Sequence, residues 1–285
     1  METKKMKSLI KKHISNELYL ELFKVTRMSH TTNNQRGTII EELLNKYEVP
    51  NTRLGSGTNR IGFLIDGFVF KFSLDKDGMI DNRREFLYAK DLFPYVIKVY
   101  ECVPNGLISV SEYVTVFDID TFNNPETQGK MRKILSEISD VLLIGDVGIT
   151  SKNYANWGTR RSGEICMLDF AYVYSISYKT FLCKCDNSTF LRYDKDYVNL
   201  YCPRCGRKYT FGTIRKRITK KIQEEEIGDI RRLSYNISSP YEEVNVVDDF
   251  EPEKVKKEKE EENRPLTAKE KIKLHKKFMK ERKIK

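Results

Sequence analysis

The sequence predicts an α+β protein with a small β-rich part, a reduced helical part, a zinc-ribbon-like insert and a charged C-terminal tail. A β-hairpin pattern runs from Arg53 to Phe72, where Asp66-Gly67 separates two runs of β-type residues. This dipeptide favours the tight turns of hairpins because their backbone needs positive φ. From Glu126 to Ile144 apolar residues recur at helical spacing, which predicts an amphipathic helix. Two close cysteine pairs follow, at positions 183, 185, 202 and 205.

The bulk composition is that of a globular body with charged appendages. The chain has 285 residues, enough for one large or two small domains, and 39% of them are hydrophobic. We find no apolar run long enough to span a bilayer and no signal-peptide pattern after Met1, so we expect a cytoplasmic protein with no membrane partner. The Lys-, Asn- and Ile-rich composition is typical of an AT-rich microbial or viral genome, and a viral chain would act in the host cytoplasm. The net charge of +10 permits binding to nucleic acid, but much of the excess lies in the tails.

Residues 1–50 are predicted to be helical and to support the hairpin. A first helical stretch has a loose apolar face, and a second short helix runs from Thr38 to Tyr47 and ends before Pro50. The residues of the apolar face are Leu9, Ile10, Ile14, Leu18, Leu20 and Leu22.

Residues 51–114 combine a glycine loop with strands and one helix. Gly55 and Gly57 precede the first strand of the hairpin, and Lys71 lies on its return strand. A glycine loop lets backbone N–H groups approach phosphates, which a Cβ would obstruct. The alternative is an ordinary hairpin with a surface lysine.

Downstream of Lys71 we expect a turn-rich stretch at 73–81 and a helix from Asn82 to Leu92 that carries Glu85. Its inward side chains are predicted to be Phe86, Leu87 and Ala89. Two further strands follow, Tyr95–Cys102 and Leu107–Val114, with a turn between them.

Residues 115–180 form the more helical part. A linker is predicted at 115–125, followed by the helix Glu126–Ile144. Asn156 then precedes a short hairpin whose second strand ends at Leu168, next to Asp169. A carboxylate at a strand end, with an amide oxygen nearby, can bind a hard cation such as Mg²⁺.

Taken in order, these residues resemble the protein-kinase-like fold, with a small N-lobe at 51–114 and a reduced C-lobe at 115–180. The resemblance covers about residues 50–175 and implies ATP and Mg²⁺ as cofactors. It implies a phosphate-covering loop, a phosphate-binding lysine with its ion-pair partner, a hinge that binds adenine through its backbone, and two Mg²⁺ ligands. The corresponding residues are Gly55, Ser56 and Gly57; Lys71 and Glu85; Glu112 to Val114; and Asn156 and Asp169. The implied activity is that of a Ser/Thr protein kinase-like phosphotransferase acting on a protein substrate.

The chain also departs from the family pattern. Arg60 replaces the third loop glycine, and Ser151 stands where the catalytic Asp is expected, five residues before Asn156. Asp146 is an alternative catalytic residue if this loop is longer here. Loss of the base lowers the rate of phosphoryl transfer without forbidding it. The alternative function is therefore a catalytically inactive, pseudokinase-like scaffold that binds protein or nucleic acid.

The insert at 181–212 is predicted to bind zinc. Four thiolates at this spacing suit a structural Zn²⁺ with no open position for chemistry, and an iron–sulfur cluster suits the ribbon-like flanks less well. The four ligands are Cys183, Cys185, Cys202 and Cys205, whereas Cys102 and Cys166 are expected to be small buried hydrophobes. A basic patch with interleaved tyrosines favours nucleic acid, and a solvated basic face is the alternative. Its residues are Arg204, Arg207, Lys208, Arg215, Lys216 and Arg217, with Tyr201 and Tyr209.

The tail at 213–285 is highly charged. One helix is predicted at 213–232, and the polar stretch from Tyr235 to Glu253 is expected to be disordered. A capping-box pattern at Thr267–Glu270 starts a terminal basic helix that continues to Lys285.

Overall fold

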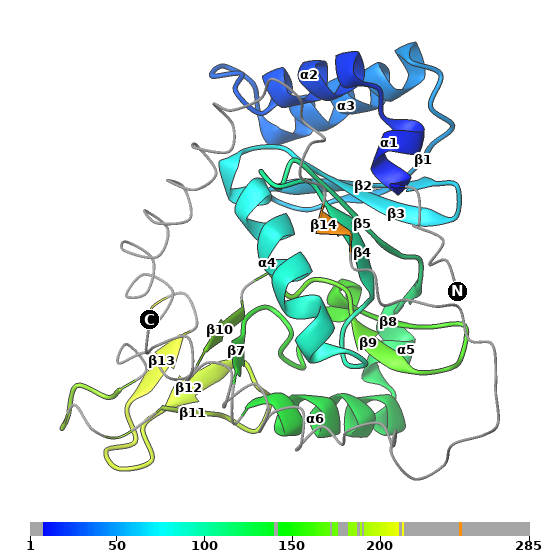
Figure 1. Cartoon of the computed structure of the whole chain (residues 1–285). Coiled ribbons are helices and arrows are strands. Elements are labelled where there is room, and N and C mark those ends of the chain that lie inside the picture. Colours follow the sequence, from blue (N-terminus) through cyan, green and yellow to red (C-terminus); the bar gives the residue numbers. More distant parts are fainter. Residues whose placement is uncertain are drawn as a thin grey trace, which may run out of the picture.

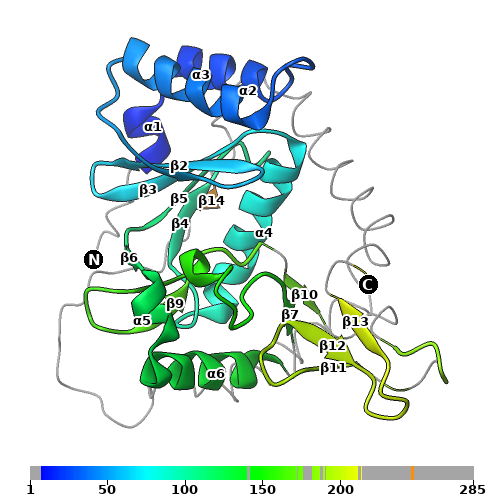
Figure 2. The same cartoon turned by 180° about the vertical axis from the view of Figure 1, so that it is seen from behind.

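The computed structural model describes residues 8–139, 142–171, 173–175, 182–186, 189, 191–210, 213 and 245–246. Three N-terminal helices cover one side of an antiparallel sheet, and a long helix runs from that sheet to a second, more helical part of the molecule (Figure 1). A small three-stranded sheet lies at the side of this second part, as the view from behind also shows (Figure 2).

The N-terminal helices are α1 (Leu9–His13), α2 (Asn16–Val25) and α3 (Asn33–Lys46). α3 begins before the predicted Thr38, because Thr32 and Gln35 form a capping box that satisfies the first backbone N–H groups. Leu20, predicted on the apolar face, is 45% exposed.

The main sheet has the strand order β1-β2-β3-β5-β4-β14, and all neighbouring pairs are antiparallel. The predicted hairpin is confirmed: β2 and β3 pair from Arg60↔Ser73 to Ile65↔Phe68 around a turn with positive φ at Asp66 and Gly67. The strands are β1 (Thr52–Ser56), β2 (Arg60–Ile65), β3 (Phe68–Ser73), β4 (Val99–Cys102), β5 (Ile108–Glu112) and β14 (Asn245–Val246).

Helix α4 spans Lys76–Leu92, so the prediction of a turn-rich stretch up to residue 81 is wrong. Asp75 caps the helix by accepting a hydrogen bond from the backbone N–H of Gly78. Gly78 packs so closely on the Asn59 carbonyl that a Cβ would lie 2.2 Å from its oxygen. A tertiary contact therefore explains a glycine that sequence patterns assign to a turn. The prediction for Leu87 is also wrong, because it is 65% exposed.

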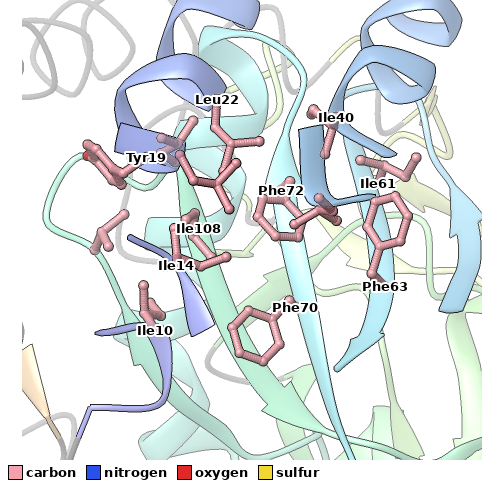
Figure 3. Close-up of a cluster of buried hydrophobic side chains, with 14 of the residues drawn as sticks. Ile10, Ile14, Tyr19, Leu22, Ile40, Ile61, Phe63, Phe70, Phe72 and Ile108 are labelled. Atoms are coloured by element: carbon pink, nitrogen blue, oxygen red, sulfur yellow. The ribbon is translucent and has the colours of Figure 1, made fainter. Parts of the chain in front are cut away.

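The first hydrophobic core lies between the N-terminal helices and the sheet (Figure 3). Ile10, Ile14 and Leu22 from the helical side face Phe70, Phe72 and Ile108 of the strands. Each of these side chains is at most 1% exposed. Burial of this apolar surface fixes the sheet against the helices and gives β2 and β3 a rigid base.

The second part of the molecule has its own buried cluster around Trp157, which is fully buried. The predicted linker at 115–125 contains β6 (Thr115–Val116) and α5 (Ile119–Asn123). The predicted helix 126–144 is shorter: α6 spans Pro125–Ser139, and residues 142–144 form β7. The other elements are η1 (Tyr154–Asn156), β8 (Trp157–Thr159), β9 (Ile165–Met167) and β10 (Val173–Ser175), which pairs with β7 (Leu142–Ile144).

The cysteine-rich insert forms a three-stranded antiparallel sheet of β11 (Arg192–Tyr193), β12 (Asn199–Tyr201) and β13 (Lys208–Thr210). Most of the tail, including both predicted helices beyond residue 213, lies outside the described residues. The stretch predicted to be disordered contains β14, which pairs with Glu101 and Cys102 of β4.

These elements confirm a mixed α+β protein with an antiparallel sheet and a four-cysteine cluster. The kinase-like division into two lobes stays a prediction. No helix within the described residues is both long and apolar enough to cross a bilayer.

Candidate nucleotide site and metal centre

Lys71 and Glu85 form the ion pair that the sequence predicts. Nζ of Lys71 lies 2.6 Å from Oε2 of Glu85 and donates to the carbonyl of Leu168 at 2.8 Å. The side chain of Glu85 is 1% exposed and that of Lys71 is 15% exposed. Strand β3 and helix α4 therefore hold the lysine against the end of β9, directly beside Asp169.

Arg60 enters the same place from the start of β2. Its Nη2 lies 2.9 Å from Oε1 of Glu85 and 2.8 Å from Oδ1 of Asp169. The backbone N–H of Phe170 also donates to Glu85, at 3.3 Å. We call Arg60, Lys71, Glu85 and Asp169 the charged cluster. Sequence reasoning noted Arg60 only as a missing glycine, although an arginine among apolar strand residues was a signal for a buried ion pair.

The charges of the cluster shift the pKa values of its members. Burial raises the pKa of Asp169, but Arg60 and Lys71 outweigh this effect and hold the pKa below its usual value. Burial likewise lowers the pKa of Arg60, and attraction to Glu85 and Asp169 more than reverses the shift. Both groups are therefore ionised at neutral pH. Asp81, on the same helix as Glu85, has its pKa raised to about 6, mainly by burial.

Asn82 connects the cluster to the sheet and was missed by the sequence analysis. It is fully buried, and its Nδ2 donates to the Lys71 carbonyl, to Oγ of Ser73 and to the Gly106 carbonyl. Its Oδ1 accepts from Arg60 at 3.3 Å and from Ser109 at 3.0 Å. One amide thus satisfies groups from β2, β3, β5 and the turn before β5.

The loop before β8 places Asp146, and not Ser151, next to Asn156. Nδ2 of Asn156 donates to the Asp146 carbonyl at 2.7 Å, and the Asn156 carbonyl accepts from the N–H of Leu168. Asp146 has φ +61°, a conformation that costs energy for a residue other than glycine and is enriched at functional sites. Ser151 is exposed in the turn that follows. Of the two predicted catalytic residues, Asp146 therefore has the contact with the predicted metal ligand.

The glycine loop lies at the end of β1, and its residues 55–57 are exposed. The N–H of Gly57 donates to the Arg60 carbonyl at 2.8 Å, so this amide closes a turn. A Cβ on Gly55 would meet nothing within 4 Å, so there is open space beside this residue. The role of the loop in binding phosphate stays a prediction.

The predicted hinge residue Glu112 is held firmly. Its N–H donates to the Lys98 carbonyl, and its Oε1 accepts from Lys98 N at 2.7 Å and from Nε of Arg160 at 2.9 Å. Val114 is 7% exposed. The adenine contact of these residues also stays a prediction.

A Mg²⁺ ion fits the predicted ligands only in part. Hydrogen bonds within the described residues engage Oδ1 of Asp169 and Nδ2 of Asn156, which leaves Oδ2 and Oδ1, respectively, as oxygen donors. The Asp169 side chain is 47% exposed, so its second oxygen is accessible. However, the guanidinium of Arg60 already neutralises this carboxylate.

The four predicted zinc ligands converge as expected. The sulfurs of Cys183, Cys185, Cys202 and Cys205 all lie within 4.8 Å of one another. Two of the separations are 3.7 and 3.8 Å. Zn–S bonds of about 2.3 Å in a tetrahedron require sulfurs about 3.8 Å apart, so this cluster fits a metal such as zinc.

Neighbouring groups affect the cysteines differently: desolvation raises the pKa of Cys185, whereas the pKa of Cys183 is lowered. The Tyr209 hydroxyl donates to Sγ of Cys183 at 3.1 Å and lowers the pKa of this thiol to about 6. The backbone N–H of Cys205 donates to Sγ of Cys202. Tyr209 is buried, so it is not part of an exposed aromatic and basic surface as the sequence analysis expected. Arg204, Arg207 and Lys208 are exposed, and residues 215–217 of the predicted patch lie outside the described residues.

The two remaining cysteines are buried strand residues, as predicted. Burial raises the pKa of Cys102 to about 12 and that of Cys166 to about 11. Both therefore stay neutral thiols and do not belong to the metal centre.

The zinc-ribbon-like sheet docks on the loop that carries Asp146. The N–H of Ile149 donates to the Asp196 carbonyl at 2.8 Å. A Cβ on Gly148 would lie 2.7 Å from the Tyr197 carbonyl oxygen, so this contact requires glycine. Arg132 of α6 pairs with Asp196 at 3.1 Å. The turn between β11 and β12 thus supports the backbone next to Asp146.

Comparison of the sequence with protein-family models finds no match, and comparison with curated proteins finds no similar sequence.

Proposed function

We propose that this chain is an ATP-binding, protein-kinase-like phosphotransferase that transfers a phosphoryl group to a hydroxyl group of a protein. The observation that carries the proposal is the position of Lys71, held between Glu85 and the Leu168 carbonyl next to Asp169. A buried, ion-paired lysine beside a half-exposed carboxylate suits the binding of phosphates.

In this proposal each residue of the site has a separate role. Lys71 binds phosphate oxygens, and Glu85 orients Lys71. Asn156 and Asp169 would each offer one oxygen to a Mg²⁺ ion, which would add positive charge beside the phosphates during transfer, although Arg60 already neutralises Asp169. Asp146 accepts the proton of the attacking hydroxyl; the hydrogen bond from Asn156 to its backbone carbonyl supports this role.

The alternative is a catalytically inactive scaffold that binds protein or nucleic acid through its basic zinc-binding module. Two observations favour it: Asp169 is engaged by Arg60, and Ser151 occupies the expected position of the catalytic base. Exposed cations on the ribbon-like module, at Arg192, Arg207 and Lys208, provide the charge for such a partner.

A thermal-shift titration with ATP, followed by transfer of labelled γ-phosphate to a Ser/Thr-rich acceptor protein, tests the proposal. Lys71→Met is expected to abolish the ATP-induced shift. Lys46→Met is the control, since Lys46 pairs only at the surface with Glu21. ATP binding without transfer supports the scaffold alternative. A wild-type protein that does not bind ATP refutes the nucleotide site.

A further inference from the structure

Arg60 is the least expected member of the charged cluster. It begins β2 directly after the glycine loop, and its side chain is 9% exposed. Three acceptors surround its guanidinium: Glu85 at 2.9 Å, Asp169 at 2.8 Å and Asn82 at 3.3 Å. An arginine held by two residues of helix α4 and by Asp169 after β9 is built into the fold and is not a surface group that happens to lie nearby.

The four residues of the charged cluster balance one another in charge without a metal ion, and Asp81, whose pKa is raised to about 6, adds a negative charge near Arg60 once it ionises. Arg60 and Lys71 supply two positive charges, and Glu85 and Asp169 supply two negative charges in direct contact with them. Without Arg60, Lys71 alone would face both carboxylates, and the excess negative charge would repel the phosphates of a nucleotide. A divalent cation commonly removes such repulsion at phosphate sites. In this cluster the guanidinium of Arg60 supplies the second positive charge.

The same contact works against tight binding of a divalent cation. Oδ1 of Asp169 accepts from Arg60, so only the outer oxygen remains for a metal. The fixed positive charge near that carboxylate also repels a second cation, and charges only a few ångströms apart interact strongly when they are partly buried. Metal binding and the Arg60–Asp169 pair therefore oppose each other.

We propose that Arg60 is the cation that balances Glu85 and Asp169, and that ATP consequently binds this protein without a divalent metal ion. Arg60 is a positioning residue in this scheme, because its guanidinium contacts Glu85, Asp169 and Asn82. The inference rests on the proposed nucleotide site and specifies how that site meets the charge of its ligand.

The test is the affinity for ATP, measured by isothermal titration calorimetry in EDTA and again in excess Mg²⁺. For the wild-type protein the two dissociation constants are expected to agree within about threefold. For Arg60→Gln, which keeps a polar side chain but removes the charge, affinity in EDTA should fall by about tenfold or more, and Mg²⁺ should restore most of it. Arg60→Lys keeps the charge and should resemble the wild-type protein in its indifference to Mg²⁺.

Two further variants separate charge balance from simple damage to the fold. Arg60→Gln combined with Asp169→Asn removes one charge of each sign, so metal-free ATP binding should return. Arg53→Gln removes an arginine from β1 that pairs at the surface with Glu41, and it should leave both affinities unchanged.

The outcomes distinguish the role of Arg60 from the existence of the proposed nucleotide site. Wild-type protein that binds ATP in Mg²⁺ but loses about tenfold or more in EDTA overturns the role of Arg60 and leaves the nucleotide site standing. Equal affinities of Arg60→Gln and wild-type protein in EDTA also overturn it. Absence of ATP binding in both buffers refutes the nucleotide site, and the inference fails with it. The wild-type comparison decides the matter even if Arg60→Gln does not fold.

Discussion

The replacement of Asn82 by alanine should destabilise the protein strongly, although the residue is remote from any surface. Its side-chain amide makes three hydrogen bonds as donor and two as acceptor, all in a fully buried environment. Alanine removes all five, and water cannot replace them without opening the sheet. The loss of stability depends on which of these groups are left without a hydrogen-bond partner.

The structure indicates the size of the effect. Ser73 and the Gly106 carbonyl keep their mutual hydrogen bond of 2.8 Å, so they lose little. Ser109 loses the acceptor of its hydroxyl, and Arg60 loses a longer contact of 3.3 Å. An unsatisfied buried polar group costs about 1–3 kcal/mol, so we expect a total loss of about 3 kcal/mol in the free energy of unfolding. This is a large fraction of the roughly 5–15 kcal/mol that stabilises a typical protein.

Urea unfolding followed by far-UV circular dichroism measures this loss. Asn82→Asp is the sharper variant, because it keeps the acceptor for Ser109 but turns an oxygen toward the Gly106 carbonyl, and it should be at least as unstable at pH 7. Asn45→Ala, on the exposed face of α3, should stay within about 0.5 kcal/mol of the wild-type protein. If Asn82→Ala is equally mild, the network does not stabilise the sheet and the reasoning is refuted.

Three other changes test separate parts of the structure. Cys202→Ser should release the metal, whereas Cys102→Ser should keep about one equivalent of zinc by elemental analysis; full retention in the first variant contradicts the four-thiolate centre. Asp81 has its pKa raised to about 6, so the folded protein holds this proton to higher pH than the unfolded chain, and stability falls as pH rises from about 4 to about 6. Asp81→Asn should remove this pH dependence and raise the free energy of unfolding at pH 7 by about 1–3 kcal/mol. Urea unfolding at about pH 4 and at pH 7 measures both effects. A pH dependence equal to that of the wild-type protein contradicts the raised pKa of Asp81. Gly148→Ala should lower the melting temperature of the zinc-loaded protein by several degrees, because its Cβ meets the Tyr197 carbonyl, and an unchanged melting temperature would show that this contact is not tight.

Local sequence patterns predict the hairpin and the four cysteine ligands, whereas the Lys71–Glu85 ion pair was expected from the resemblance to the kinase-like fold. Asp66-Gly67 determines the turn, the turn determines the register of β3, and that register places Lys71 opposite Gly62. Glu85 reaches Lys71 because α4 packs directly on the strand. The spacing of the four cysteines predicts a metal site, because four thiolates in a small polar insert commonly bind a structural metal ion.

Tertiary contacts account for the features that the sequence did not reveal. Helix α4 begins early because Gly78 packs on the Asn59 carbonyl, and no local pattern encodes that partner. Asparagine is a polar residue that is usually found on the surface of a helix, yet the side-chain amide of Asn82 is buried against the sheet. The Asp146 carbonyl accepts a hydrogen bond from Asn156 ten residues later, a contact that sequence spacing alone does not predict.

The cysteine-rich sheet, which carries the candidate zinc site, contacts the candidate catalytic loop through residues 147–149. On one side, Trp157 donates from Nε1 to the Val147 carbonyl at 3.1 Å, which ties the loop to the second core. On the other side, the N–H of Ile149 bonds to Asp196 in the turn between β11 and β12. That turn belongs to a sheet with few apolar residues, so metal binding must supply much of its folding free energy. Loss of zinc therefore weakens one support of the backbone next to Asp146, while Lys71, Glu85 and Arg60 keep their contacts in the first part of the molecule. Zinc removal should consequently impair phosphoryl transfer more than ATP binding.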